Sequence, residues 1–70
     1  MSKIQSVLFD IHYWTPKEAK YWLKMHGMEP IKRVHATNHF LHYRLREPSQ
    51  FSRLRIKRVG KHIEFIIGFY

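Results

Sequence analysis

Two stretches of the chain alternate basic and apolar residues, and this period of two constrains the fold more than any other feature. Successive side chains of a β-strand point to opposite faces of its sheet, so each stretch can place apolar residues in a core and cations on the other face. The basic positions, in order along the two stretches, are His42, Arg44, Arg46, Arg53, Arg55 and Lys57. We therefore predict two basic strands in one sheet.

Length and charge limit the classes of fold and partner. The chain has 70 residues, which predicts a single small basic domain over 1–70 with one modest core. An aromatic content of 16% argues against intrinsic disorder. Lys and Arg number 13 against 5 Asp and Glu, a formal charge of +8. Because an anionic surface relieves such self-repulsion, the charge favours nucleic acid, an acidic protein surface or an anionic membrane as the partner.

No segment has the character of a targeting signal or a membrane span. The residues after Met1 alternate, whereas a signal peptide would carry an unbroken apolar run. The longest apolar run is too short to cross a bilayer. The absence of cysteine fits a reducing compartment. We therefore expect a soluble protein inside a cell or a virion that is neither secreted nor bound to a membrane.

The strongest local signal is the start of a helix. Thr15 is a suitable N-cap, Pro16 suits the first helical position, and Glu18 completes a capping box. Gly27 fits the left-handed position that often follows a helix. A helix over 16–26 is therefore predicted.

The rest of the chain reads as strands joined by turns. Alternating or β-branched stretches predict five strands, at 4–13, 31–36, 39–46, 52–58 and 62–69. The element order is then β-α-β-β-β-β, an α+β fold with an antiparallel sheet and one helix packed on one face. We expect both basic rows on the face that the helix leaves uncovered.

The cations of these rows are the leading candidates for a binding site. Guanidinium groups bind phosphate oxygens in pairs, and cations along a strand can follow a phosphate backbone. A solvated face would usually mix Lys with Glu, whereas these rows contain almost no acids. Such a patch positions a protein on a backbone and reads little base sequence. The predicted nucleic-acid-binding residues are Arg44, Arg46, Arg53, Arg55 and Lys57, extended by His42, Arg58 and Lys61.

Exposed aromatic rings could add stacking on unpaired bases. Trp14 and Tyr70 are the better candidates among the rings, because Tyr43 alternates with the basic row and should face the core.

The histidines and carboxylates indicate neither a metal site nor an enzyme. His35, His39 and His42 are close in sequence, but a hairpin would point them to different faces and no cysteine is present. No pair of carboxylates, Gly-rich phosphate loop or nucleophile motif is evident. We predict that the protein is not an enzyme and needs no cofactor or metal; a metal-free nuclease site at His42 and Arg44 is the open alternative.

Several segments are similar to one known family. The run from Trp14 to Gly27, the run from Tyr43 to Pro48 and the segment 63–69 resemble a small domain of unassigned function found in tailed-phage proteins and in large DNA viruses. Some of those phage proteins lie near head-maturation proteases. The resemblance extends over nearly all of the chain from Ile11 onward and includes no signature of catalysis. It implies a viral or phage protein of the host cytoplasm or virion. This chain is more basic around 31–42 than the family pattern, which favours nucleic acid as the partner.

Two classes of function remain. The first is a small viral nucleic-acid-binding protein that uses a basic sheet face on the phosphate backbone with little sequence specificity. The second is a protein–protein interaction module, either a virion component or an inhibitor of a host machine. It would bind an acidic surface with its cations or an apolar surface with Tyr21 and Met25. The protein could be a monomer or a homodimer, since sheet edges can pair between copies.

Overall fold

The computed structural model describes all 70 residues and contains one helix and one sheet. In chain order the elements are β1 (Ser2–Asp10), α1 (Pro16–Met25), β2 (His35–Ala36), β3 (Phe40–Arg44), the 3₁₀ turn η1 (Pro48–Gln50), β4 (Arg53–Gly60) and β5 (Ile63–Phe69). The predicted α+β class and the predicted order of elements are confirmed. No helix of the structure has both the length and the apolar character that crossing a membrane requires.

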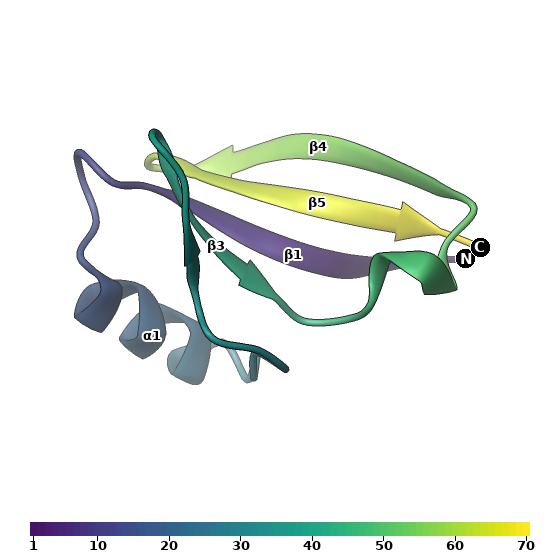
Figure 1. Cartoon of the computed structure of the whole chain (residues 1–70), viewed down its shortest axis with the longest axis horizontal. Coiled ribbons are helices and arrows are strands. Elements are labelled where there is room, and N and C mark those ends of the chain that lie inside the picture. Colours follow the sequence, from purple (N-terminus) through teal and green to yellow (C-terminus); the bar gives the residue numbers. More distant parts are fainter.

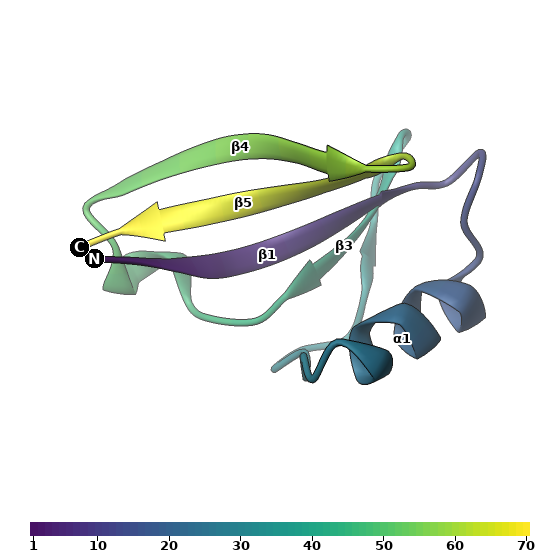
Figure 2. The ribbon, with the colours of Figure 1, turned by 180° about the vertical axis from the view of Figure 1, so that it is seen from behind.

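The strands form one antiparallel sheet in the order β2-β3-β1-β5-β4. Figures 1 and 2 show α1 on one side of this sheet, at the end away from the chain termini and clear of β4. We call the side that carries α1 the helix face and the other side the open face. The view of Figure 1 looks onto the open face, with α1 behind the sheet.

The ends of α1 follow the predicted pattern. The Thr15 hydroxyl accepts a hydrogen bond from the Glu18 amide at 3.2 Å, and the Glu18 carboxylate accepts one from the Thr15 amide at 3.0 Å. Gly27 has a φ of +68°, the left-handed conformation that glycine adopts without strain. The Met28 amide then donates to the Leu23 carbonyl at 2.9 Å, which closes the helix one residue earlier than predicted.

The core lies between α1 and the strands opposite it. Phe9 is at its centre, with its ring edge-on to those of Trp14, Trp22 and Tyr43 at centroid distances of 5.1, 5.7 and 5.7 Å. The buried apolar residues of this cluster are Val7, Phe9, Ala19, Leu23, Leu41, Tyr43 and Ile63. None of them belongs to β4, of which every residue is exposed.

Strand boundaries differ from the prediction where polar groups redirect the chain. β1 ends at Asp10, not Tyr13, because the Asp10 carbonyl accepts hydrogen bonds from the Tyr13 and Trp14 amides at 3.1 and 2.9 Å. The predicted strand 31–36 is reduced to the two residues of β2. Within the irregular part only the Ile31 amide still bonds β3, at the Arg44 carbonyl, at 2.9 Å.

A buried glutamine lies at a bulge within β1, which no sequence pattern predicted. Gln5 is only 2% exposed and lies where the register of β1 with β5 shifts. Its carbonyl accepts from the Leu45 and Arg46 amides at 2.8 and 3.2 Å, and its side-chain Nε2 donates to the Arg46 carbonyl at 2.7 Å. Gln5 is the extra residue of a β-bulge, and its hydrogen bonds hold the chain in place where it leaves β3.

Candidate nucleic-acid interface

The pairing register decides on which face of the sheet each cation lies. Directly opposed residues of antiparallel strands point to the same face. Lys57 of β4 is opposite Phe65 of β5. Phe65 is in turn opposite Val7, which is opposite Tyr43. Val7 and Tyr43 are 0% and 1% exposed in the core beneath α1, so Lys57 lies on the helix face.

Arg53 and Arg55 share that face with Lys57, and we call these three residues the β4 cation row. Alternate residues of a strand are roughly 7 Å apart, so the row is an evenly spaced line along the sheet edge. All three residues are exposed, and none forms an ion pair with a carboxylate. The Arg53 guanidinium lies over the Phe69 ring, 5.4 Å from its centroid, in a cation–π contact. The row is thus positioned by the sheet without being neutralised.

The basic residues of β3 lie on the other side of the sheet. His42 and Arg44 flank the buried Tyr43, so their side chains point to the open face. The prediction that the two basic rows form one patch on the uncovered face is therefore wrong. β1 and β5 separate β3 from β4, and the register places Lys57 in line with Tyr43, not with Arg44.

Two predicted site residues near the end of β3 have local partners. The Arg44 guanidinium lies 3.7 Å from the Glu47 carboxylate, which also pairs with Lys32 at 3.3 Å. Arg46 lies beyond β3, and its guanidinium donates to the Ile4 carbonyl at 3.1 Å. Arg44 and Arg46 therefore contribute to local structure and lie apart from the β4 cation row.

The two predicted extensions on the β4–β5 hairpin also lie outside the row. Arg58 is opposite Glu64 on the open face, with 3.8 Å between the guanidinium and the carboxylate. Lys61 is in the turn between the strands, where its carbonyl accepts a hydrogen bond from the Trp14 indole at 3.0 Å. Trp14 thereby joins the hairpin tip to the start of α1.

His42 has the most perturbed environment of the predicted site residues. Burial, followed by the charges of Arg44 and His35, holds the pKa of His42 below its ordinary value. His35 is directly opposite His42 in the β2–β3 pair, whereas His39 precedes β3 in the turn. The Nε2 atom of His42 is buried and has no hydrogen-bond partner. No group of three or more His, Cys, Asp or Glu side chains is placed to hold a metal ion.

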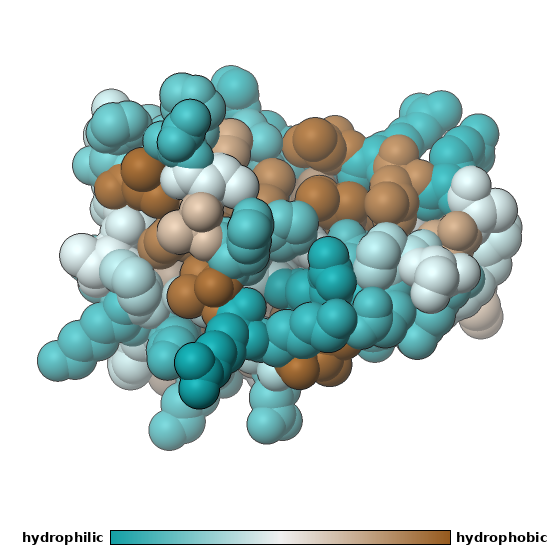
Figure 3. All heavy atoms as spheres, in the orientation of Figure 1, coloured by the Kyte–Doolittle hydropathy of each residue, from teal (hydrophilic) through white to brown (hydrophobic).

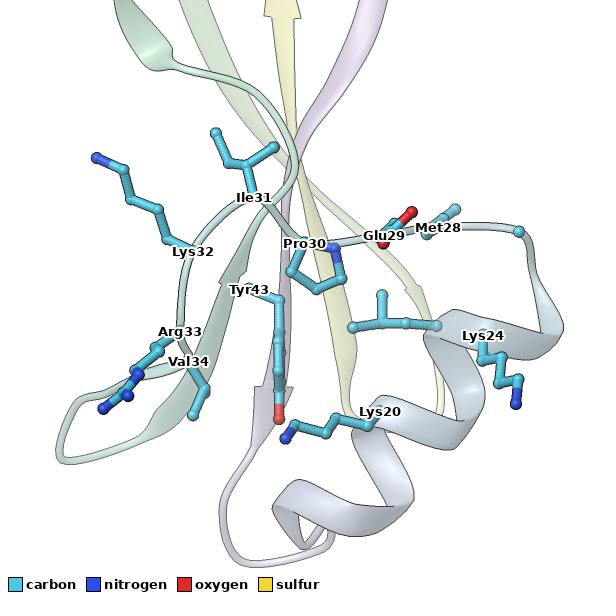
Figure 4. A pocket seen from close by; sticks show the side chains of 12 residues that line it. Lys20, Lys24, Met28, Glu29, Pro30, Ile31, Lys32, Arg33, Val34 and Tyr43 are labelled. Carbon is cyan, nitrogen blue, oxygen red and sulfur yellow. The ribbon is translucent and has the colours of Figure 1, made fainter.

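The largest cavity lies between α1 and the segment 28–34 and has a volume of about 1030 Å³. Leu23 and Tyr43 both line it, and the Tyr43 hydroxyl donates to the Pro16 carbonyl at 3.3 Å. Burial raises the pKa of Tyr43. The cations around this cavity are Lys20, Lys24, Lys32 and Arg33. In Figure 4 the last two point away from α1, so they are directed toward a different surface.

Sequence reasoning missed an apolar strip on the open face. Leu54 and Ile56 alternate with the β4 cation row and were expected to face a core, but they are 43% and 65% exposed. Ile56 is opposite Ile66, and Leu54 is opposite Gly68, over which the Phe51 ring lies. Figure 3 shows hydrophobic side chains gathered over β4 and β5 on this side. The strip stays exposed because α1 covers the other face.

The aromatic candidates for base stacking do not lie beside the β4 cation row. Tyr43 is buried, as predicted. Trp14 packs edge-on against Phe9 at 5.1 Å. Tyr70 is 59% exposed but contacts the Phe51 ring at a centroid distance of 5.0 Å, on the side of the apolar strip. The rings nearest the row are instead those of β5, Phe65 and Phe69, both half-buried.

Comparisons of the chain with protein-family models, with curated proteins and with solved structures found no match. The similarity to the phage and viral domain therefore stays a prediction from sequence.

Proposed function

We propose that this protein binds nucleic acid through the β4 cation row, which contacts the phosphate backbone with little preference for base sequence. The observation that carries the proposal is that Arg53, Arg55 and Lys57 form an exposed row along the sheet edge without a single carboxylate partner. Unpaired cations retain their full charge for phosphate, and each phosphate they neutralise releases condensed counterions. The family resemblance adds a viral or phage setting to the proposal.

The surroundings of the row favour a backbone contact over base recognition. Sequence is read by side chains that reach base edges, whereas cations that contact phosphates position a protein without reading sequence. Phe65 and Phe69 lie beside the row and are half-buried, and the Arg53 guanidinium already lies over the Phe69 ring, which limits stacking on bases.

The test is a fluorescence-anisotropy titration of the full chain against single-stranded and duplex DNA and RNA at two salt concentrations. We expect a steep negative slope of log affinity against log salt. Replacing Arg53, Arg55 and Lys57 together by Gln should reduce this slope by about 2–3, because each lost phosphate contact removes about 0.7–0.9. Affinity at low salt should fall by more than about tenfold.

A matched control separates the row from the general charge of the protein. The triple substitution of Lys3, Lys17 and Lys24 by Gln removes the same charge from three exposed positions outside the row. It should leave most of the affinity and of the salt slope in place. If both triple variants lose affinity equally, binding depends on net charge alone and the assignment to β4 is wrong.

The apolar strip on the open face supports a second candidate function, a protein–protein interaction module. The exposed Leu54 and Ile56, together with the half-buried Ile66 opposite Ile56, form an apolar surface of the kind that protein partners cover. A protein that purifies free of nucleic acid, with a 260/280 absorbance ratio that high salt does not lower, would favour this candidate. An Ile56→Lys variant that loses a captured partner but keeps its fold would then support it.

A further inference from the structure

A second, smaller cavity lies on the far side of β3 from the core. It has a volume of about 320 Å³ and lies beside the segment that leads into β2. Its lining residues are Lys32, Arg33, Val34, His35, His42 and Arg44. We call it the histidine cavity. Five of its six lining side chains are basic, and no carboxylate lines it.

One residue of this cavity's lining, His42, has a buried nitrogen that lacks a hydrogen-bond partner. The buried Nε2 of His42 has no hydrogen-bond partner anywhere in the chain. An unsatisfied buried polar atom costs about 1–3 kcal/mol, and such atoms are rare enough in folded proteins to need an explanation. His42 lines the histidine cavity, but its Nε2 is covered in this structure, so the ring must turn before Nε2–H can donate to an oxygen atom held there and remove this penalty.

The charges around the cavity define the ligand that would supply this oxygen. Lys32 and Arg44 share one carboxylate, that of Glu47, at 3.3 and 3.7 Å. Arg33 forms no ion pair. Three permanent cations and one carboxylate leave two positive charges uncompensated. A phosphomonoester carries about −1.5 to −2 at neutral pH and has three acceptor oxygens, which matches both this charge and the available donors.

We propose that the histidine cavity binds a phosphomonoester group, held by Arg33 and Arg44, and that the His42 ring turns on binding so that Nε2–H donates to a phosphate oxygen. The guanidinium of Arg44 uses one nitrogen toward Glu47, and its other donors are free for the phosphate. A small cavity receives the end of a molecule more readily than a continuous chain, which distinguishes this site from the β4 cation row. The two sites lie on opposite faces of the sheet, so the inference does not depend on the proposed function.

The phosphomonoester could belong to a free nucleotide or to the 5′ end of a nucleic acid. NMR titrations of the full chain with adenosine 5′-monophosphate, adenosine and inorganic phosphate test the site itself. We expect the His42 ring and the Arg44 amide to shift with the monophosphate and with inorganic phosphate, but not with adenosine. Equal shifts with adenosine and its monophosphate, or no shift at His42, would overturn the proposal.

Substitutions at exposed positions test whether the monophosphate binds in the histidine cavity, because they should leave the protein folded. Arg33 is exposed, so Arg33→Gln should fold normally and weaken monophosphate binding by at least about tenfold, the loss expected for one hydrogen bond to a charged group. Lys17→Gln removes the same charge from α1 and should leave the affinity unchanged. If both variants weaken binding equally, the cavity is not the site.

A last comparison identifies the source of the phosphate. An oligonucleotide with a 5′-phosphate is titrated against the same oligonucleotide with a 5′-hydroxyl, using protein in which the β4 cation row is replaced by Gln. Phosphate-dependent binding of the oligonucleotide at His42 would assign the site to nucleic-acid ends. Binding of the mononucleotide alone would assign it to free nucleotides.

Discussion

β3 and β4 carry the same alternation of cationic and apolar residues but have opposite environments in the sheet. In β3 the apolar residues Leu41 and Tyr43 are 5% and 1% exposed beneath α1, and Arg44 is paired with Glu47. In β4 the apolar residues are exposed, and the three cations of the row have no carboxylate partner. Alternation separates two kinds of side chain, and the neighbouring elements then decide which kind is buried.

The difference also predicts where stability resides. β3 is held by β1, by β2 and by the helix, whereas β4 is paired with β5 alone at the sheet edge. Core contacts therefore stabilise the β3 half of the molecule, and β4 is free to present both of its faces to partners.

The largest difference between β3 and β4 should appear when one apolar side chain is removed from each strand. Tyr43→Ala should lower the free energy of unfolding by about 3–5 kcal/mol, because it empties the core beneath α1. Leu54→Ala should change it by no more than about 0.5 kcal/mol, as is usual for surface positions. Urea denaturation followed by circular dichroism measures both values.

A 70-residue domain can be too unstable to tolerate the larger of these losses. Tyr43→Phe keeps the ring and removes only the hydrogen bond to the Pro16 carbonyl, so it should lower stability by about 1 kcal/mol. Equal effects of Tyr43→Ala and Leu54→Ala would show that β4 is as well packed as β3.

Two glycines of the β4–β5 hairpin test whether the Phe51 ring covers the open face beside β4. A Cβ added at Gly68 would collide with the Phe51 ring, so Gly68→Ala should destabilise the protein by about 1–3 kcal/mol. Gly60 has no atom near the corresponding position, and Gly60→Ala should be close to neutral. Thermal unfolding of the two variants makes the measurement. A neutral Gly68→Ala would mean that Phe51 does not cover this part of the sheet.

The lowered pKa of His42, in β3, predicts how the stability of the protein depends on pH. The pKa of His42 is lowered in the folded state, chiefly by burial, so the unfolded chain binds this proton more readily. Stability should therefore fall as pH drops below the ordinary histidine value of about 6.5 toward the lowered pKa of the folded state. His42→Gln should flatten that part of the pH profile, measured by urea denaturation from pH 8 to pH 5. Identical profiles for both proteins would contradict the assignment.

The smallest expected effect concerns the ion pair on the open face of β4. The Arg58 side chain is 83% exposed, so its contact with Glu64 is largely screened by water. Arg58→Gln should lower stability by less than about 0.5 kcal/mol at low salt, and this difference should vanish at high salt. A loss above about 1 kcal/mol would show that this pair stabilises the β4–β5 hairpin.

Local signals in the sequence predicted the elements well. Thr15, Glu18 and Gly27 specify the two ends of α1 through contacts within a few residues, and these contacts form as expected. Alternation likewise located β3, β4 and β5, because it depends only on the strand itself.

The arrangement of the site could not be predicted in the same way. Whether Lys57 lies in line with Tyr43 or with Arg44 depends on the strand order and on the register of two intervening strands, which no local pattern contains. The bulge at Gln5 shifts that register further. The unpartnered nitrogen of His42 likewise arises from contacts between β2, β3 and the segment before them.

The pairing of β1 with β5 joins the two ends of the chain, where the Tyr70 amide donates to the Met1 carbonyl at 3.4 Å (Figure 2). These central strands can meet only after the chain has closed a loop through almost its whole length, and pairings of high sequence separation slow folding. A circular permutant, with the termini joined by a short linker and new ends opened at Asn38, would turn β5 and β1 into a local hairpin. It should fold faster than the original chain while keeping the same sheet.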